Sequence, residues 1–152
     1  MTLRRLLWTG FGLGLLPRAP GTWGTLLGVA LAGGAGALPG THVVLLALVL
    51  VLFFAGAHLA RWAAAETRRA DPPSFVLDEV VGYLAAVLWL PVADRPWLVL
   101  GGAFVLFRVL DIAKPWPIGR LERAPGGWGV MLDDLAAGLI ANAGLRISLL
   151  WL

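Results

Sequence analysis

The sequence predicts an integral membrane protein built from about five apolar helices and folded as one domain over residues 1–152. The chain is 59% hydrophobic and only 14% charged, whereas soluble domains usually carry about 25% charged residues. Its mean hydropathy is +0.84. No Asp, Glu, Lys or Arg occurs from residue 19 to residue 60, and a stretch of this length can cross a bilayer core of roughly 30 Å twice.

Five apolar segments make up the predicted bundle. They cover residues 23–38, 42–60, 80–91, 96–110 and 132–151. Turn chemistry separates them in the stretches LPGTH (38–42), DPPS (71–74) and LPVADRP (90–96). The third and fourth segments are short for full crossings, so the number of crossings could differ by one. Tryptophan lies near several segment ends, as at Trp62 and Trp97, which is typical of a membrane interface.

The charges are distributed asymmetrically. If each segment crosses the membrane once, residues 1–22, 61–79 and 111–134 share one face. Ten of the twelve basic residues belong to that face, the exceptions being Arg95 and Arg146. Because cytoplasmic loops carry the excess of Lys and Arg, we expect a multi-pass protein whose polar motifs face the cytoplasm. The net charge of +3 gives no indication of nucleic-acid binding.

The first polar motif is LLPRAPGTWGT, residues 15–25. Its Pro and Gly residues favour an extended backbone before Thr22, which would cap the helix that follows. The free N–H groups of this helix start, with Arg18 nearby, would suit an anionic oxygen. Taken alone, an ordinary helix cap after a turn is the simpler explanation.

The second motif, FVLDEVVGYL, places Asp78 and Glu79 at the start of an apolar segment. The helix macrodipole favours a carboxylate there by about 0.3–1 kcal/mol. The macrodipole is a sufficient explanation for one acid at this position. It is a weaker explanation for two, because neighbouring like charges repel. Adjacent helical positions also point about 100° apart.

The third motif, FRVLDIAKPWPIGRLER, contains the only lysine of the chain. On a helix, Arg108 and Asp111 share one face and Lys114 continues it, until Pro115 and Pro117 stop the helix. A surface salt bridge would contribute only about 0.3–0.5 kcal/mol. These charges, however, follow an apolar run, and ionisable groups at such depth usually face a bundle interior and serve a function.

The fourth motif, GGWGVMLDDLAAG, places Asp133 and Asp134 at a predicted helix start after glycines that could let the backbone approach a ligand. Helix capping is again the alternative. However, five of the nine acids of the chain now adjoin apolar segments on one face: Asp78, Glu79, Asp111, Asp133 and Asp134. Uncompensated carboxylates are costly to desolvate. A divalent cation removes this cost, and oxygen ligands without cysteine favour Mg²⁺ or Mn²⁺.

A metal ion, arginines and free backbone N–H groups on one membrane face favour phosphate chemistry. The chain has no cysteine nucleophile, and His42 and His58 fall on the far side and within an apolar segment. A metal-activated water and an aspartate nucleophile both remain open. In either case, Arg108 and Lys114 would offset charge on the phosphoryl oxygens.

The four motifs together, in this order, resemble the phosphatidylglycerophosphatase A family of bacterial membrane enzymes over about residues 10–145. The resemblance implies an all-α fold and Mg²⁺-dependent hydrolysis of phosphatidylglycerophosphate to phosphatidylglycerol and phosphate. It also implies a place in phospholipid synthesis at the inner membrane.

Carried over by position, the family's functional residues give a site hypothesis. The catalytic set is Asp78, Glu79, Asp111, Lys114, Asp133 and Asp134. We expect Glu79, Asp111, Asp133 and Asp134 to bind metal. Asp78 would act as nucleophile or base. The residues expected to bind the substrate phosphate are Arg108, Lys114, Arg18 and Thr22.

Three alternatives stay open at this point. Carboxylates within a membrane also mark ion pathways, so the chain could be an ion-coupled carrier. It could also be a non-catalytic assembly subunit whose glycines serve helix packing. Finally, the same chemistry could act on another lipid phosphate, such as phosphatidic acid.

Overall fold

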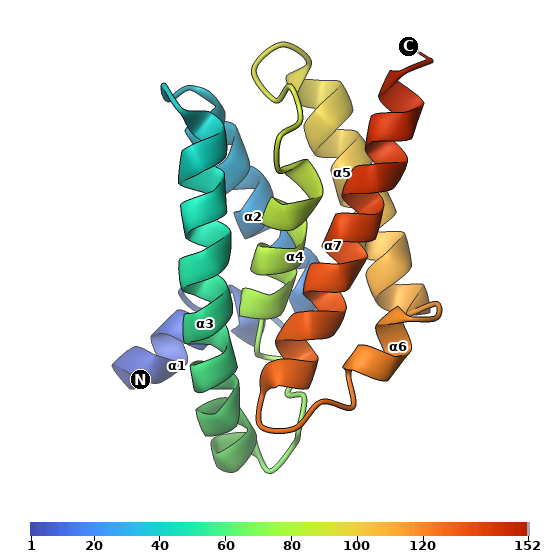
Figure 1. Cartoon of the computed structure of the whole chain (residues 1–152). Coiled ribbons are helices and arrows are strands. Elements are labelled where there is room, and N and C mark those ends of the chain that lie inside the picture. Colours follow the sequence, from blue (N-terminus) through green and yellow to red (C-terminus); the bar gives the residue numbers. More distant parts are fainter. Residues whose placement is uncertain (152) are drawn as a thin grey trace.

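A computed structural model describes residues 1–151 of the chain (Figure 1). These residues form seven α-helices and one short 3-10 helix, and none of them forms a β-strand. The elements are α1 (Leu3–Trp8), η1 (Leu13–Leu15), α2 (Pro20–Gly36), α3 (Thr41–Thr67), α4 (Leu77–Val87), α5 (Pro96–Ala113), α6 (Ile118–Leu121) and α7 (Trp128–Leu149). The prediction of an all-helical protein is confirmed.

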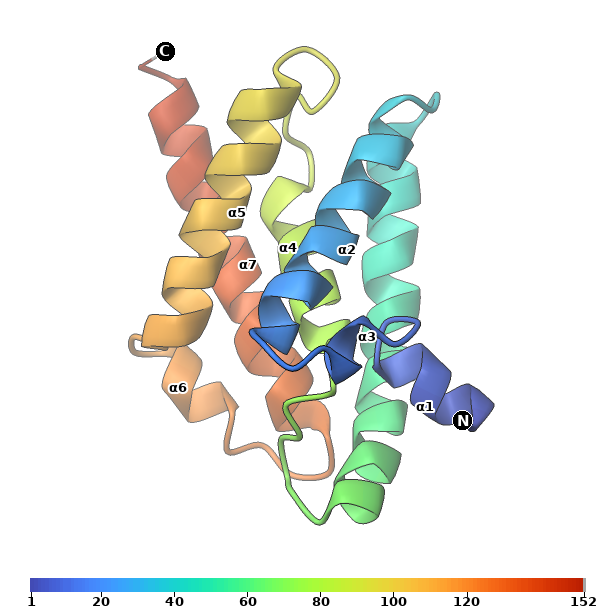
Figure 2. The ribbon, with the colours of Figure 1, turned by 180° about the vertical axis from the view of Figure 1, so that it is seen from behind.

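The centre of the bundle is α4, which α2, α3, α5 and α7 surround (Figures 1 and 2). Ten of its eleven residues are buried, as expected for a helix that is apolar on nearly all sides. At a rise of 1.5 Å per residue, α4 is only about 16 Å long. It is therefore too short to cross a bilayer core of roughly 30 Å by itself.

Glycines let α4 and α7 pack backbone against backbone. A Cβ on Gly138 would clash with the carbonyl oxygen of Gly82, and a Cβ on Gly82 would lie 2.6 Å from the carbonyl oxygen of Asp134. Small residues at helix contacts are common in membrane bundles because they permit such close approach. This contact sets the distance between the acids on α4 and those on α7.

The chain leaves the helical conformation after Val87, so the predicted apolar segment 80–91 is helical only in its first part. The freed carbonyl groups have partners on α7. The Asn142 side-chain amide donates to the Leu88 carbonyl oxygen at 2.8 Å, and Arg146 Nη2 donates to the Leu88 and Trp89 carbonyl oxygens at 3.1 and 3.2 Å. These bonds explain the arginine within the last apolar segment, because carbonyl groups freed at the end of a packed helix need hydrogen-bond partners.

Two helices, α3 and α5, are long and apolar enough to cross a membrane, with mean hydropathies of 2.7 and 1.7. A membrane location therefore fits the structure. One end of the bundle, which we call the polar end, gathers the starts of α2, α4 and α7 and the ends of α3 and α5 (Figure 1). The loops 37–40 and 88–95 lie at the opposite end.

Candidate active site

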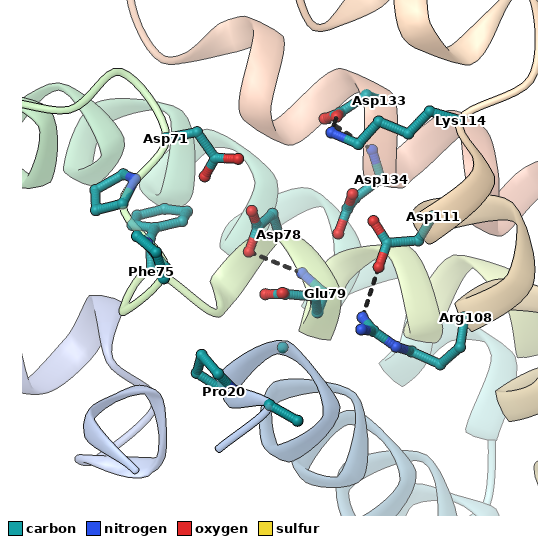
Figure 3. A pocket seen from close by; sticks show the side chains of 14 residues that line it. Pro20, Asp71, Phe75, Asp78, Glu79, Arg108, Asp111, Lys114, Asp133 and Asp134 are labelled. Atoms are coloured by element: carbon teal, nitrogen blue, oxygen red, sulfur yellow. Dashed lines mark hydrogen bonds and ion pairs between the residues drawn. The ribbon is translucent and has the colours of Figure 1, made fainter. Parts of the chain in front are cut away.

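A pocket of about 330 Å³ opens at the polar end of the bundle (Figure 3). Its walls come from the start of α2, the loop before α4, the first turn of α4, the end of α5 and the second turn of α7. The lining residues are Ala19, Pro20, Gly21, Asp71, Pro72, Pro73, Phe75, Asp78, Glu79, Arg108, Asp111, Lys114, Asp133 and Asp134. The pocket thus brings together all six residues of the predicted catalytic set, together with Arg108.

Three carboxylates form the tightest group in the pocket. Asp78, Glu79 and Asp134 each offer one oxygen atom, and these atoms lie within 4.8 Å of one another. Within residues 1–151, Glu79 Oε2 and Asp134 Oδ2 are buried and have no hydrogen-bond partner. Buried polar atoms nearly always have one, and desolvated carboxylates that face each other repel. The geometry and the oxygen-only donor set therefore fit a hard divalent cation.

The helix positions decide between a capping role and a binding role for these acids. Asp78 and Glu79 occupy the first turn of α4, as predicted. Asp133 and Asp134 do not start α7, which begins at Trp128 and has no acid in its first turn. The prediction of a helix start at these residues is therefore wrong. Since the macrodipole effect fades beyond the first turn, helix capping does not account for Asp133 and Asp134.

Asp111 pairs with Arg108 one turn earlier on α5. Arg108 Nη1 donates to Asp111 Oδ2 at 2.5 Å, and both side chains are largely buried. A guanidinium group has five N–H donors, so this pair leaves donors for a further anion. Gly21 at the start of α2 allows the approach, because a Cβ there would clash with Glu79 Oε1 and lie 3.2 Å from Arg108 Nη1.

Lys114 joins the end of α5 to α7. It caps α5 in the left-handed conformation, with a φ of 42°, and Pro115 follows it as predicted. Its ammonium donates to Asp133 Oδ2 at 2.6 Å and lies 3.5 Å from Glu122 Oε2. Asp133 is only 2% exposed. Both cations of the pocket therefore hold a carboxylate in place.

The charge of the pocket is strongly negative without a cation. Six carboxylates and two basic groups line it, which gives a formal charge of −4. A phosphate dianion would be repelled by this field unless a metal ion or protons offset it. The charge balance thus points to the same conclusion as the unpartnered oxygen atoms.

Sequence reasoning missed Asp71, which stands at the mouth of the pocket beside Asp78 (Figure 3). Desolvation raises the pKa of its carboxyl above the ordinary value, although the Lys114 ammonium opposes this shift. The stretch DPPS indicated only a turn. The available signal was the position of Asp71 on the same predicted membrane face as the polar motifs.

Two predicted phosphate-binding residues do not line the pocket, namely Arg18 and Thr22. The prediction that Thr22 caps a helix is wrong, because α2 begins at Pro20 and Ala19 holds the N-cap position. Arg18 is exposed just before this start. The glycines of the GGWG stretch also serve another purpose, since a Cβ on Gly127 would lie 2.6 Å from the Ala57 carbonyl oxygen on α3.

Comparison with known proteins identifies close relatives. The chain is 38% identical over 137 residues to phosphatidylglycerophosphatase A of Haemophilus influenzae, covering 90% of this chain and 82% of that protein. It is 39% identical over 137 residues to phosphatidylglycerophosphatase A of Escherichia coli, covering 90% and 77%. It is also 40% identical over 141 residues to a protein of Bacteroides thetaiotaomicron named as a candidate phosphatidylinositol-3-phosphatase, covering 88% and 86%.

No solved structure matches the chain. The model of the phosphatidylglycerophosphatase A family matches residues 6–149, nearly the whole chain. This match confirms the resemblance that the four motifs indicated. The chain therefore belongs to the phosphatidylglycerophosphatase A family, and it is an enzyme of the phosphatase class.

Proposed function

We propose that this enzyme hydrolyses phosphatidylglycerophosphate to phosphatidylglycerol and inorganic phosphate, with Mg²⁺ as cofactor. The single observation that carries the proposal is the convergence of Asp78, Glu79 and Asp134, two of them with buried, unpartnered oxygen atoms, in a pocket that also contains Arg108. Family membership supports the choice of lipid. We further propose that residues 1–152 act as one domain.

In this proposal, Asp78, Glu79 and Asp134 hold the cation. When bound, Mg²⁺ offsets negative charge on the phosphoryl group and lowers the pKa of water in the site. Asp111 and Asp133, which the sequence predicted as metal ligands, instead orient Arg108 and Lys114 through their ion pairs. This division of roles uses every acid of the predicted catalytic set.

The basic residues and Asp71 reduce the electrostatic repulsion between the acidic pocket and the negatively charged substrate. The free donors of Arg108 bind phosphoryl oxygens, and Lys114 contributes positive charge while it holds Asp133. Because its pKa is raised, Asp71 retains a proton more readily than an aspartate of ordinary pKa, which reduces the repulsion that a phosphate meets on entry. Arg18, exposed near the start of α2, attracts the anionic headgroup from the surface, and Thr22 follows in the first turn of α2.

The test is phosphate release by the purified protein from three lipids: phosphatidylglycerophosphate, phosphatidic acid and phosphatidylinositol 3-phosphate. Release from the first substrate in Mg²⁺ and its loss in EDTA would support the proposal. Preference for another lipid would replace the substrate but keep the chemistry. If no lipid releases phosphate, the chain is not acting as a phosphatase, and a carrier or an assembly subunit becomes the better explanation. Full activity in EDTA would contradict the metal site.

We also propose that the protein crosses the inner membrane several times, with the pocket facing the cytoplasm. Ten of the twelve basic residues lie on the side assigned to the polar end. Because the chain lacks cysteine, a cysteine placed at Ala124 gives a clean label. A membrane-impermeant thiol reagent should modify it in inverted vesicles and not in intact cells. Labelling in intact cells would reverse the orientation.

A further inference from the structure

A second cavity, of about 340 Å³, lies between α2 and α5. We call it the α2–α5 groove. Its lining is apolar throughout and consists of Leu26, Val29, Trp97, Leu100, Gly101, Phe104 and Val105. Leu26 is 41% exposed and Val105 is 60% exposed, so the groove opens to the outside of the bundle. Figure 2 shows α2 and α5 on either side of α4, which lies behind them.

The α2–α5 groove and the active-site pocket share the same two helices. On α5, Gly101, Phe104, Arg108 and Asp111 are separated by three, four and three residues, so they form one stripe along the helix. The first two line the groove and the last two line the pocket. The apolar surface therefore continues directly from the candidate phosphate-binding arginine.

The same continuity holds on α2. Gly21 lines the pocket, whereas Leu26 and Val29 line the groove. Thr22 precedes Leu26 by four residues and Val29 by seven, so all three share a helix face. Thr22, which lines neither the pocket nor the groove, lies on this face of α2 next to Gly21 of the pocket.

The dimensions suit a lipid chain. Arg108 and Trp97 are eleven positions apart on α5, which corresponds to about 16 Å along the helix axis. This is close to the hydrocarbon depth of one leaflet, about 15 Å. The groove has no charged residue in its lining, so its chemistry fits an acyl chain and not a headgroup.

We infer that one acyl chain of the substrate lies in the α2–α5 groove while the phosphate occupies the pocket, so that the lipid enters sideways between α2 and α5. This inference rests on the proposed function. A different apolar cavity, of about 190 Å³, lies on another face of α2 and is lined by residues of α1, the loop after α1, α2, α3 and α4, among them Leu27, Leu52 and Ala55. No residue of α5, the helix that carries Arg108, lines this cavity.

Gly101→Phe tests the inference because a Cβ at Gly101 meets no atom within 4 Å, so the new ring fills the groove and leaves the core unchanged. The full-length protein is assayed on long-chain phosphatidylglycerophosphate and on its water-soluble deacylated form. We expect kcat/KM to fall by about tenfold or more on the long-chain lipid, because the apolar burial of several methylene groups is lost. The rate on the deacylated substrate should change less than about twofold, because that substrate has no acyl chain to bury.

Two controls match this change. Gly34→Phe makes the same substitution on α2, also in open space and outside the groove, and Ala55→Phe fills the other apolar cavity. Neither variant should change the preference for the long-chain lipid. An unchanged preference in Gly101→Phe would overturn the inference. If the wild-type protein released no phosphate from either substrate, the proposed function itself would fail, which is a distinguishable result.

If Gly101→Phe loses activity on both the long-chain and the deacylated substrate, a measurement on the wild-type protein tests the inference instead. A phosphatidylglycerophosphate analogue with a photoreactive group in its acyl chain is crosslinked and the labelled peptides are mapped. Labels on 22–33 and 97–108 support the groove. Labels confined to α3 would overturn it.

Discussion

The contact between α4 and α7 gives the sharpest prediction, through the single substitution Gly138→Ala. The added Cβ would clash with the Gly82 carbonyl oxygen and lie 2.8 Å from its carbon. Ordinary contacts begin at 3.4 Å, so the contact with the carbon alone requires a separation of about 0.6 Å, and the contact with the closer oxygen requires more. Both neighbours are backbone, so no side chain can rotate away to absorb the strain.

The displacement reaches the carboxylate cluster because Gly138 follows Asp134 by one helical turn, and Gly82 follows Asp78 by one turn. Overpacking of this kind costs about 1–3 kcal/mol in stability. A shift of about 1 Å in a catalytic group can lower the rate by about 10²-fold. We therefore expect a protein that still folds, with a lower Tm and with kcat reduced by one to two orders of magnitude.

The assay combines phosphate release in Mg²⁺ with thermal unfolding in the same detergent. Gly144→Ala is the control, since it lies on the same helix and its Cβ would meet Leu106 Cδ1 at an ordinary 3.9 Å. It should leave both the rate and the Tm close to wild type. Wild-type kcat and Tm in Gly138→Ala would refute the view that this backbone contact sets the spacing of the carboxylates.

Three further single variants and one double variant follow from the same structure. Asp134→Asn should weaken Mn²⁺ binding, measured by calorimetry, by at least the 10–100-fold known for outer-shell partners of metal ligands; unchanged affinity would place the cation elsewhere. Asn142→Leu removes one hydrogen-bond donor from the Leu88 carbonyl oxygen, so the free energy of unfolding should fall by about 1–3 kcal/mol. A Tm equal to that of wild type would contradict a stabilising role for the Asn142 amide. Lys114→Met strands the buried Asp133 charge and should cost about 3–5 kcal/mol. Adding Asp133→Leu should restore the stability but not the activity, and a double variant as unstable as the single one would argue against a simple ion pair.

Much of the site could be predicted from the sequence because helical spacing controls it. Arg108 and Asp111 are three residues apart and meet as expected. Because successive segments alternate in direction, the start of α4 and the start of α7 come to the same end of the bundle. The start of α7 was misplaced because Gly126 and Gly127 adopt positive φ values and let the helix begin at Trp128.

Other features depend on which helices become neighbours, and the sequence does not encode this in any local pattern. Asp71 joins the pocket only because its loop folds over the start of α4. The amide of Asn142 reaches residues more than fifty positions earlier in the chain. Likewise, the separation of the five acids into a group of three close carboxylates and two ion pairs follows from side-chain directions across three helices.

The enclosure of α4 has a consequence for biogenesis. This helix is too short to settle in a bilayer alone, and the walls that shield it include α5 and α7, which emerge later from the ribosome. We expect it to stay near the aqueous boundary, with Asp78 hydrated, until the last helix inserts. A cysteine at Val81 should therefore be open to thiol reagents in a chain truncated after residue 127 and protected in the full-length chain; equal protection in both would show that α4 docks without α7.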